Sequence, residues 1–167
     1  MEPGQSGLEV GEMIPIPVSL GQANSRNDIS ALLVSPFDSD QAALQEVFSE
    51  QRWRLHIGAD YQSARSVLQT EPLAVVICEQ WLWDGDWRDV LRACNRLFHP
   101  PRVIVASRTA DKRLDTDVLL RGGYAILSTP FDAHAIQAAV WLAWHSWRQQ
   151  WGAGYSANTE MPFAAGG

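Results

Sequence analysis

The stretch Leu73-Ala-Val-Val-Ile-Cys78 decides the fold class, because it is a continuous apolar run. Such a run is typical of a central strand that is buried on both faces of a parallel sheet. Working outward, shorter apolar runs at 29–34, 53–57, 103–106 and 124–127 predict four further strands. The run at 53–57 alternates apolar with polar residues, so we expect it to lie nearer an edge of the sheet.

Apolar residues at helical spacing follow each of these strands and predict five helices, the last reaching about Trp151. Short strands joined by helices require right-handed crossovers, which place the strands parallel. The expected fold is therefore α/β, a doubly wound five-stranded parallel sheet with helices on both faces. Ligand sites of such a sheet lie at the carboxyl ends of its strands. The residues expected to cap helices are Asp38 or Ser39, Asp86, Asp111 and Asp132.

Composition divides the chain into one domain with two loose ends. Residues 1–28 are rich in Gly, Pro, Ser, Asn and Gln, which predicts a flexible N-terminal arm. Residues 29–151 carry the strand and helix pattern and form the expected domain. Residues 152–167 are again rich in small residues and predict a flexible C-terminal tail.

Charge and residue usage exclude several classes of function. The net charge is −6 and the chain has a single lysine, so we expect no nucleic-acid partner. No apolar run approaches the length that spans a bilayer, and no signal peptide is visible, so we expect no membrane partner. The two cysteines, Cys78 and Cys94, fall in apolar segments and predict reduced core thiols, which favours the cytoplasm. The four histidines are scattered and predict no metal site.

Four segments carry a resemblance to a known family: 31–40, 74–79 followed by Asp84-Gly85, 102–107 and 122–132. Over about residues 29–148 the chain resembles the receiver domains of two-component response regulators, which have a flavodoxin-like fold. The most specific segment is the last, where a Gly-rich helix exit precedes a strand that ends in Thr129-Pro130-Phe131. The resemblance implies a site where a phosphoacceptor Asp, an acidic pair, Mg²⁺ and a lysine meet.

Placed on that pattern, the acidic side of the site is degenerate. The acidic pair becomes Ser35 and Pro36, and neither supplies a carboxylate. The phosphoacceptor-equivalent residue is Glu79, or Cys78 if the register differs by one residue. Asp38 or Asp40 is an alternative metal ligand, although a helix cap is the simpler use of both.

The remaining positions of the pattern are partly lost. The lysine-equivalent position is Thr129, which precedes a retained Pro130. The switch-equivalent residues are Ser107, which is retained, and Ile126 in place of an aromatic residue. Losing both metal and lysine removes the electrostatic stabilisation on which phosphoryl transfer depends.

We therefore expect an atypical, stand-alone pseudo-receiver that acts in signal transduction by protein–protein interaction. It has no catalytic residues, no metal and no cofactor, and it is not an enzyme. The alternatives are a receiver that is phosphorylated on an unusual acceptor, or a flavodoxin-like module that stacks a small molecule on Trp81 or Trp83. Glu79 is either a built-in mimic of phosphorylation that hydrogen-bonds Ser107 or Thr129, or a solvated acid without a signalling role.

Eight tryptophans suggest a partner surface. Trp81, Trp83 and Trp87 crowd the loop after the third strand, and four more lie on the last helix. On that helix the expected interface residues are Trp141, His145 and Arg148, on a face distinct from the core stripe. The resemblance adds a homodimer through the fourth and fifth helices as one expected partner. The alternative is that these rings pack under the terminal arms.

Overall fold

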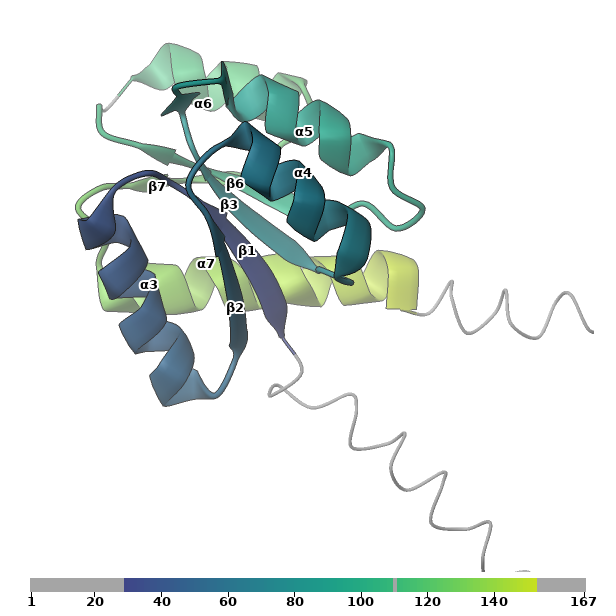
Figure 1. The fold of residues 1–167 in the computed structure, drawn as a ribbon, viewed down its shortest axis with the longest axis horizontal. Helices are drawn as coiled ribbons and strands as arrows, with labels where there is room; N and C mark the ends of the chain where they lie inside the picture. Colours follow the sequence, from purple (N-terminus) through teal and green to yellow (C-terminus); the bar gives the residue numbers. More distant parts are fainter. Residues whose placement is uncertain (1–28, 110, 153–167) are drawn as a thin grey trace, which may run out of the picture.

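The computed structural model describes residues 29–109 and 111–152, and there it forms one five-stranded parallel sheet (Figure 1). The strand order β2-β1-β3-β6-β7 places β3 in the centre and β2 at one edge, as predicted. The expected doubly wound α/β fold is confirmed. The strands are β1 (Ser30–Val34), β2 (Arg54–Gly58), β3 (Val75–Glu79), β6 (Arg102–Ser107) and β7 (Ala125–Ser128).

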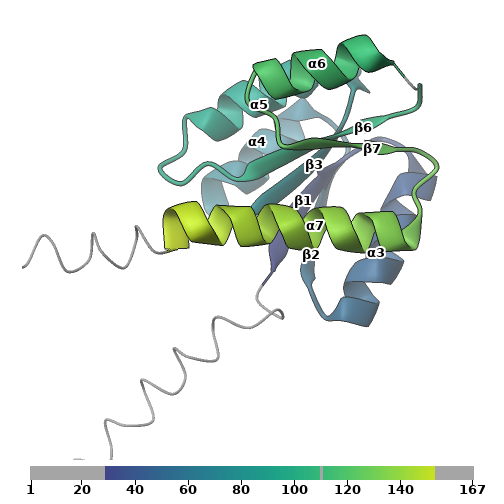
Figure 2. The same ribbon diagram turned by 180° about the vertical axis from the view of Figure 1, so that it is seen from behind.

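The helices form two layers, one on each face of the sheet (Figures 1 and 2). One face is covered by α3 (Asp38–Gln51) and α7 (Ala133–Trp147), which is continued by a π-helical turn at Arg148–Gly152. The other face is covered by α4 (Tyr61–Thr70), α5 (Trp87–Asn95) and α6 (Lys112–Leu120). Alternate residues of each strand serve the two cores, so that Ile77 faces α3 and α7 while Cys78 faces the other layer.

Aspartates begin most of the helices, as predicted. Asp86 accepts hydrogen bonds from the amides of Arg88 and Asp89 and forms a capping box with Asp89. Asp111 caps α6 by accepting a hydrogen bond from the amide of Arg113, and Asp132 caps α7 by accepting one from the amide of Ala135.

The predicted cap of α3 is wrong. Its N-cap is Phe37, which supplies no side-chain hydrogen bond, and Asp38 and Ser39 already lie within the helix. The polar residues of the expected cap lie one and two residues inside the helix instead. The consequence is that the aspartates of the first turn are released for other contacts.

The segment after β3 is more ordered than an expected loop. Trp81–Leu82 (β4) and Gly85–Asp86 (β5) pair as a two-stranded antiparallel hairpin. Trp87, expected in a crowded loop, is instead the first residue of α5 and is fully buried in the core. Trp81 and Trp83 remain exposed.

The last helix presents the predicted core stripe. Ile136, Val140 and Trp144 are buried against the sheet, and Trp147 continues the stripe as a half-buried residue. Gly152, which the sequence analysis placed in the C-terminal tail, closes the π-helical turn after α7. The arm at 1–28 and the rest of the tail lie outside the described residues.

Two further expectations concern thiols and membranes. Cys78 and Cys94 are free and buried, as predicted, and burial raises the pKa of the Cys94 thiol to about 12. Across residues 29–109 and 111–152, no helix is both long and apolar enough to cross a bilayer.

Candidate functional site

The strands end together at one edge of the sheet, and polar residues gather there. Ser35 follows β1, Glu79 ends β3, Ser107 ends β6 and Thr129 follows β7. Parallel strands place their carboxyl ends on one side, so residues far apart in sequence meet there. We call this group, completed by Asp40 and Arg108, the carboxyl-edge site.

Glu79 is the carboxylate at the tip of the central strand. It is only 4% exposed and lies opposite Ala106 of β6. Its Oε2 atom lies 3.4 Å from Nε of Arg108, whereas Oε1 is buried without a hydrogen-bond partner. Of the two candidates that the sequence left open, Cys78 points away into the core under α4–α6. Glu79 is therefore not the solvated acid that one alternative described.

Burial governs the ionisation of Glu79. Desolvation raises the pKa of the Glu79 carboxyl above its usual value. Arg108 opposes that shift, and the neighbouring Asp40 carboxylate adds to it. Burial thus disfavours the ionised form of Glu79, and the guanidinium of Arg108 favours it.

Arg108 is the site residue that the sequence analysis missed. Its Nη2 atom lies 2.6 Å from Oδ2 of Asp40, and its guanidinium carbon lies 3.9 Å from the centre of the Phe37 ring. One cation therefore contacts two buried carboxylates and one aromatic face. The available signal was its position, a basic residue directly after the fourth strand at the ligand-binding edge.

Asp40 reaches the site from the first turn of α3. It is 3% exposed, and its Oδ2 accepts a hydrogen bond of 2.8 Å from Oγ of Ser35. Ser35 Oγ in turn accepts one from the Phe37 amide. Asp40 is therefore no helix cap, in contrast to the simpler use expected of it, while Asp38 is exposed and makes no contact in this site.

The switch-equivalent and lysine-equivalent positions bond to backbone instead of to Glu79. Ser107 Oγ donates to the carbonyl of Thr109, and Thr129 donates to the carbonyl of Ser107 from both its amide and its hydroxyl. Among the described residues, Glu79 accepts no hydrogen bond from Ser107 or Thr129, and Arg108 faces its carboxylate instead. Ile126 lies on β7 opposite Val105 and is half-buried. The peptide bond before Pro130 is cis.

The donor set does not fit Mg²⁺. A hard dication requires several oxygen ligands, and the two carboxylates of this site already share a guanidinium. Ser35 and Pro36 bring no carboxylate to the site. No group of three or more His, Cys, Asp or Glu side chains is arranged around a common point in the described part of the chain.

The residues expected at an interface lie away from this site, on α7 and the turn after it. The Trp141 ring is half-buried and stacks on His145 at 5.1 Å between ring centres. The guanidinium of Arg148 lies 5.3 Å from the centre of the Trp144 ring, at the far end of the helix. These contacts describe the residues, and their role at an interface stays a prediction.

No protein-family model matches the chain, and no curated protein matches it. Solved structures do match it. A signal receiver domain of an HD domain-containing protein from Pseudomonas fluorescens superposes with a TM-score of 0.68 at 22% identity, over 75% of this chain and 93% of that chain. A CheY-like receiver domain protein from Methanospirillum hungatei gives 0.66 at 12% identity, over 73% and 98%. The Saccharomyces cerevisiae Ssk1 receiver domain, crystallised with the phosphotransfer protein Ypd1, gives 0.60 at 15% identity, over 67% and 86%. These likenesses show that the chain has the flavodoxin-like fold of receiver domains.

Proposed function

We propose that this chain is a degenerate receiver domain, which acts in signal transduction by binding other proteins and without phosphorylation of an aspartate or binding of Mg²⁺. The fold supports the first half of the proposal. One observation carries the second half: the guanidinium of Arg108 already bridges the carboxylates of Asp40 and Glu79.

The chemistry of phosphoryl transfer explains why that bridge matters. The reaction needs a dication and a fixed cation to neutralise the transferring group, and these terms dominate its catalysis. Here Ser35 and Pro36 follow β1 where the reaction needs an acidic pair, and Thr129 stands where it needs a lysine. A guanidinium held by two carboxylates replaces the metal as the counter-charge, but it leaves no open ligand position.

The same bridge links two elements of the site. Arg108 joins the start of α3, through Asp40, to the tip of β3, through Glu79. In a phosphorylated receiver a bound charge at the tip of the central strand would order the loop after the fourth strand. We propose that Glu79 and Arg108 supply a fixed version of that ordering.

The partner surface that we propose comprises α6, β7 and α7. Large apolar side chains are exposed on its helices, namely Leu119 and Leu120 of α6 and Leu142 of α7, and a partner would cover them. Trp141 and His145 lie on α7, and Arg148 begins the π-helical turn that follows it. Either a signalling protein or a second copy of this chain is the proposed occupant, and no enzymatic activity is proposed.

Treatment of the full chain with acetyl phosphate and Mg²⁺, followed by intact-mass measurement, tests the proposal. We expect an unchanged mass, because the site has neither the metal ligands nor the lysine that the reaction requires. A receiver domain with a complete acidic site serves as the positive control. A stable gain of one phosphoryl group would overturn the proposal in favour of an unusual acceptor.

A further inference from the structure

The hairpin of β4 and β5 presents two tryptophans to solvent on a rigid support. Trp83 is 81% exposed and Trp81 is 61% exposed. Asp84, in the turn of the hairpin, accepts hydrogen bonds from the amides of Tyr61 and Gln62 and so ties the hairpin to the start of α4. Trp83 Nε1 donates to Asp60, which fixes the direction of the ring. We call Trp81 and Trp83 the tryptophan knob.

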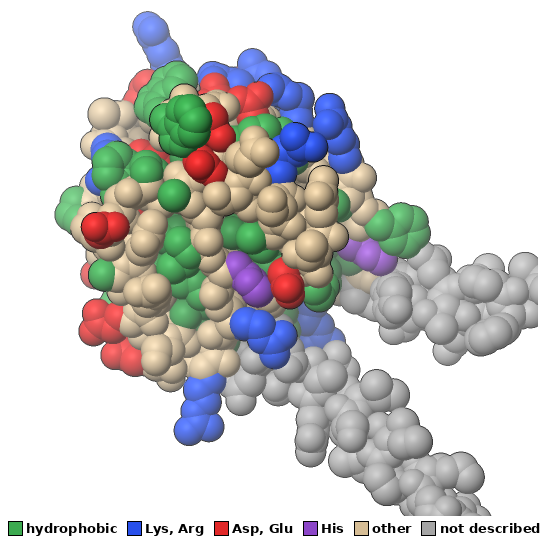
Figure 3. Space-filling model, viewed as in Figure 1, with side chains coloured by type: hydrophobic (Ala, Val, Ile, Leu, Met, Phe, Trp, Pro, Cys, Tyr) green, Lys and Arg blue, Asp and Glu red, His purple; other side chains and the backbone are tan. Residues whose placement is uncertain are grey.

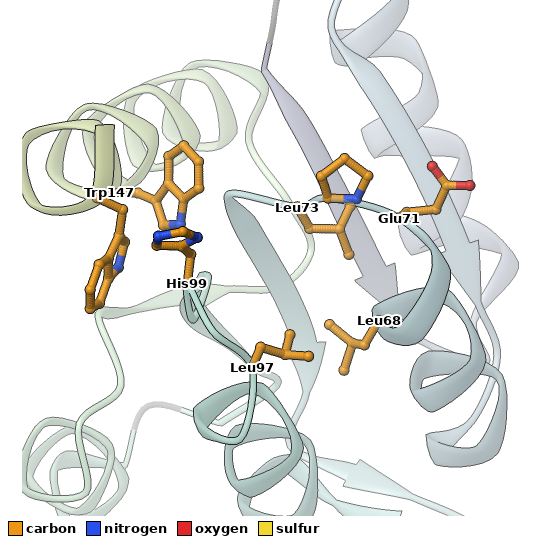
Figure 4. A pocket seen from close by; sticks show the side chains of 8 residues that line it. Leu68, Glu71, Leu73, Leu97, His99 and Trp147 are labelled. Atoms are coloured by element: carbon orange, nitrogen blue, oxygen red, sulfur yellow. The ribbon is translucent and has the colours of Figure 1, made fainter. Parts of the chain in front are cut away.

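An apolar pocket of about 450 Å³ lies at the other end of α4 (Figure 4). Figure 4 shows Leu68, Leu73 and Leu97 on one side of it, with His99 and Trp147 on the other. This volume is within the range of pockets that hold small ligands, so a single indole ring fits inside it. We call this cavity the α4-end pocket. Its remaining lining residues are Glu71, Pro72 and Trp151.

The charges around the knob and around the pocket are of opposite sign. Asp60 and Asp84 flank the knob. Arg65 and Arg96 line a shallower hollow that shares Leu68 and Leu97 with the α4-end pocket. Figure 3 shows the same separation, with hydrophobic and acidic side chains together over the hairpin and Lys and Arg side chains gathered over α5. Glu71 is the one acid in the pocket, and its carboxylate lies 3.9 Å from Nε2 of His56.

We propose that this chain associates with copies of itself head to tail, the tryptophan knob of one copy entering the α4-end pocket of the next. The hairpin is held in position before binding, which lowers the entropic cost of ordering it. Tryptophan is enriched among interface hot spots, which lie in well-packed, desolvated pockets. The acidic flank of the knob then faces the arginines beside the pocket.

This geometry predicts an open assembly. The knob and the pocket lie at opposite ends of α4, so the contact joins two different surfaces, and each pair of copies keeps one free knob and one free pocket. Such a contact grows with concentration instead of stopping at two copies. It differs in this respect from the homodimer through α6 and α7, which closes on itself.

Sedimentation velocity over a concentration series of the full chain tests the inference. We expect the mean mass of the wild type to rise with concentration and to fall with added salt, since exposed charges are screened. Trp83→Ala removes the more exposed ring of the knob and should raise the apparent dissociation constant at least about 10-fold. Gln45→Ala, which shortens an exposed side chain of α3 on the opposite face of the sheet, is the control and should leave the assembly intact.

Complementation gives the sharper result. Leu97→Glu places a charge in the pocket that repels Asp60 and Asp84, whereas Trp83→Ala leaves the pocket open. Each variant alone should be monomeric, and a mixture should form a 1:1 complex that does not grow further. Arg65→Glu combined with Arg96→Glu is a second way to disable the pocket side, and both positions are exposed, so the fold is not at risk.

Two outcomes would overturn the inference. A wild type that stays monomeric at every concentration would show that the knob and the pocket do not meet. Dimers that persist in both single variants would assign self-association to another surface, such as α6 and α7. Neither outcome bears on the acetyl phosphate experiment, so failure here and failure of the proposed function are distinguishable.

Discussion

Replacing Arg108 with alanine is expected to lower the free energy of unfolding by about 2 kcal/mol at neutral pH. The substitution leaves the carboxylates of Asp40 and Glu79 close together and almost fully buried without a cation. Breaking such a pair costs more than its formation contributes, because the remaining charge stays desolvated. Arg108 is 39% exposed, so solvent screens part of the effect and keeps it below that of a fully buried pair. Urea denaturation followed by circular dichroism measures it.

Glu79→Gln provides the matched control for that prediction. Alone it should be neutral or stabilising by up to about 1 kcal/mol, because it removes a buried charge whose Oε1 has no partner. Combined with Arg108→Ala it should restore roughly half of the lost stability, since only one carboxylate then lacks a cation. Additive effects of the two substitutions would contradict the proposed bridge.

The cost of losing Arg108 should also depend on pH. Burial already raises the pKa of Glu79 in the folded chain, and removing Arg108 raises it further. A carboxyl group with a raised pKa stabilises the folded state below its unfolded pKa, and this contribution is lost as pH rises through the folded value. The difference between wild type and Arg108→Ala should therefore be smallest in acid and largest at neutral pH.

Restoring the lost charges should create a Mg²⁺ site. The variant combines Ser35→Asp, Pro36→Asp, Glu79→Asp and Thr129→Lys with Arg108→Ala. We expect saturable Mg²⁺ binding by isothermal titration calorimetry, because three carboxylates then converge where the strands end. The fold is checked by circular dichroism before the titration.

The control for this gain of binding retains Arg108 with the other four substitutions. It should bind Mg²⁺ at least about 10-fold more weakly, since the guanidinium competes for the same carboxylates. If both variants fold and neither binds Mg²⁺, Glu79 does not mark the phosphoacceptor position.

The layout of the sheet could be read from sequence because burial imposes a simple pattern on each strand. The run at Leu73–Cys78 predicted the central strand β3, and the alternation at 53–57 predicted the edge strand β2. The hairpin of β4 and β5 was not predicted, because two-residue strands carry no periodic signal. Trp87 was misplaced for a related reason, since a single aromatic residue next to a turn does not reveal whether it faces the core.

The sequence predicted where the site lies but not the contacts within it. Parallel strands bring their ends together, and the resemblance to receiver domains picked out Glu79, Ser107 and Thr129 among those ends. The contacts between side chains depend on residues distant in sequence, as in the ion pair between Arg108 and Asp40. A single arginine after a strand is indistinguishable from an ordinary surface residue until α3 is packed beside it.

Titration of the wild-type chain with Mg²⁺ through the millimolar range, followed by the amide NMR signals of Ser35, Glu79 and Arg108, tests the central claim most directly. The account predicts that these signals stay in place, because the counter-charge of the site is already a guanidinium. Saturable shifts at these three amides would contradict it, since they would show that the carboxylates of the carboxyl-edge site release Arg108 to hold the metal.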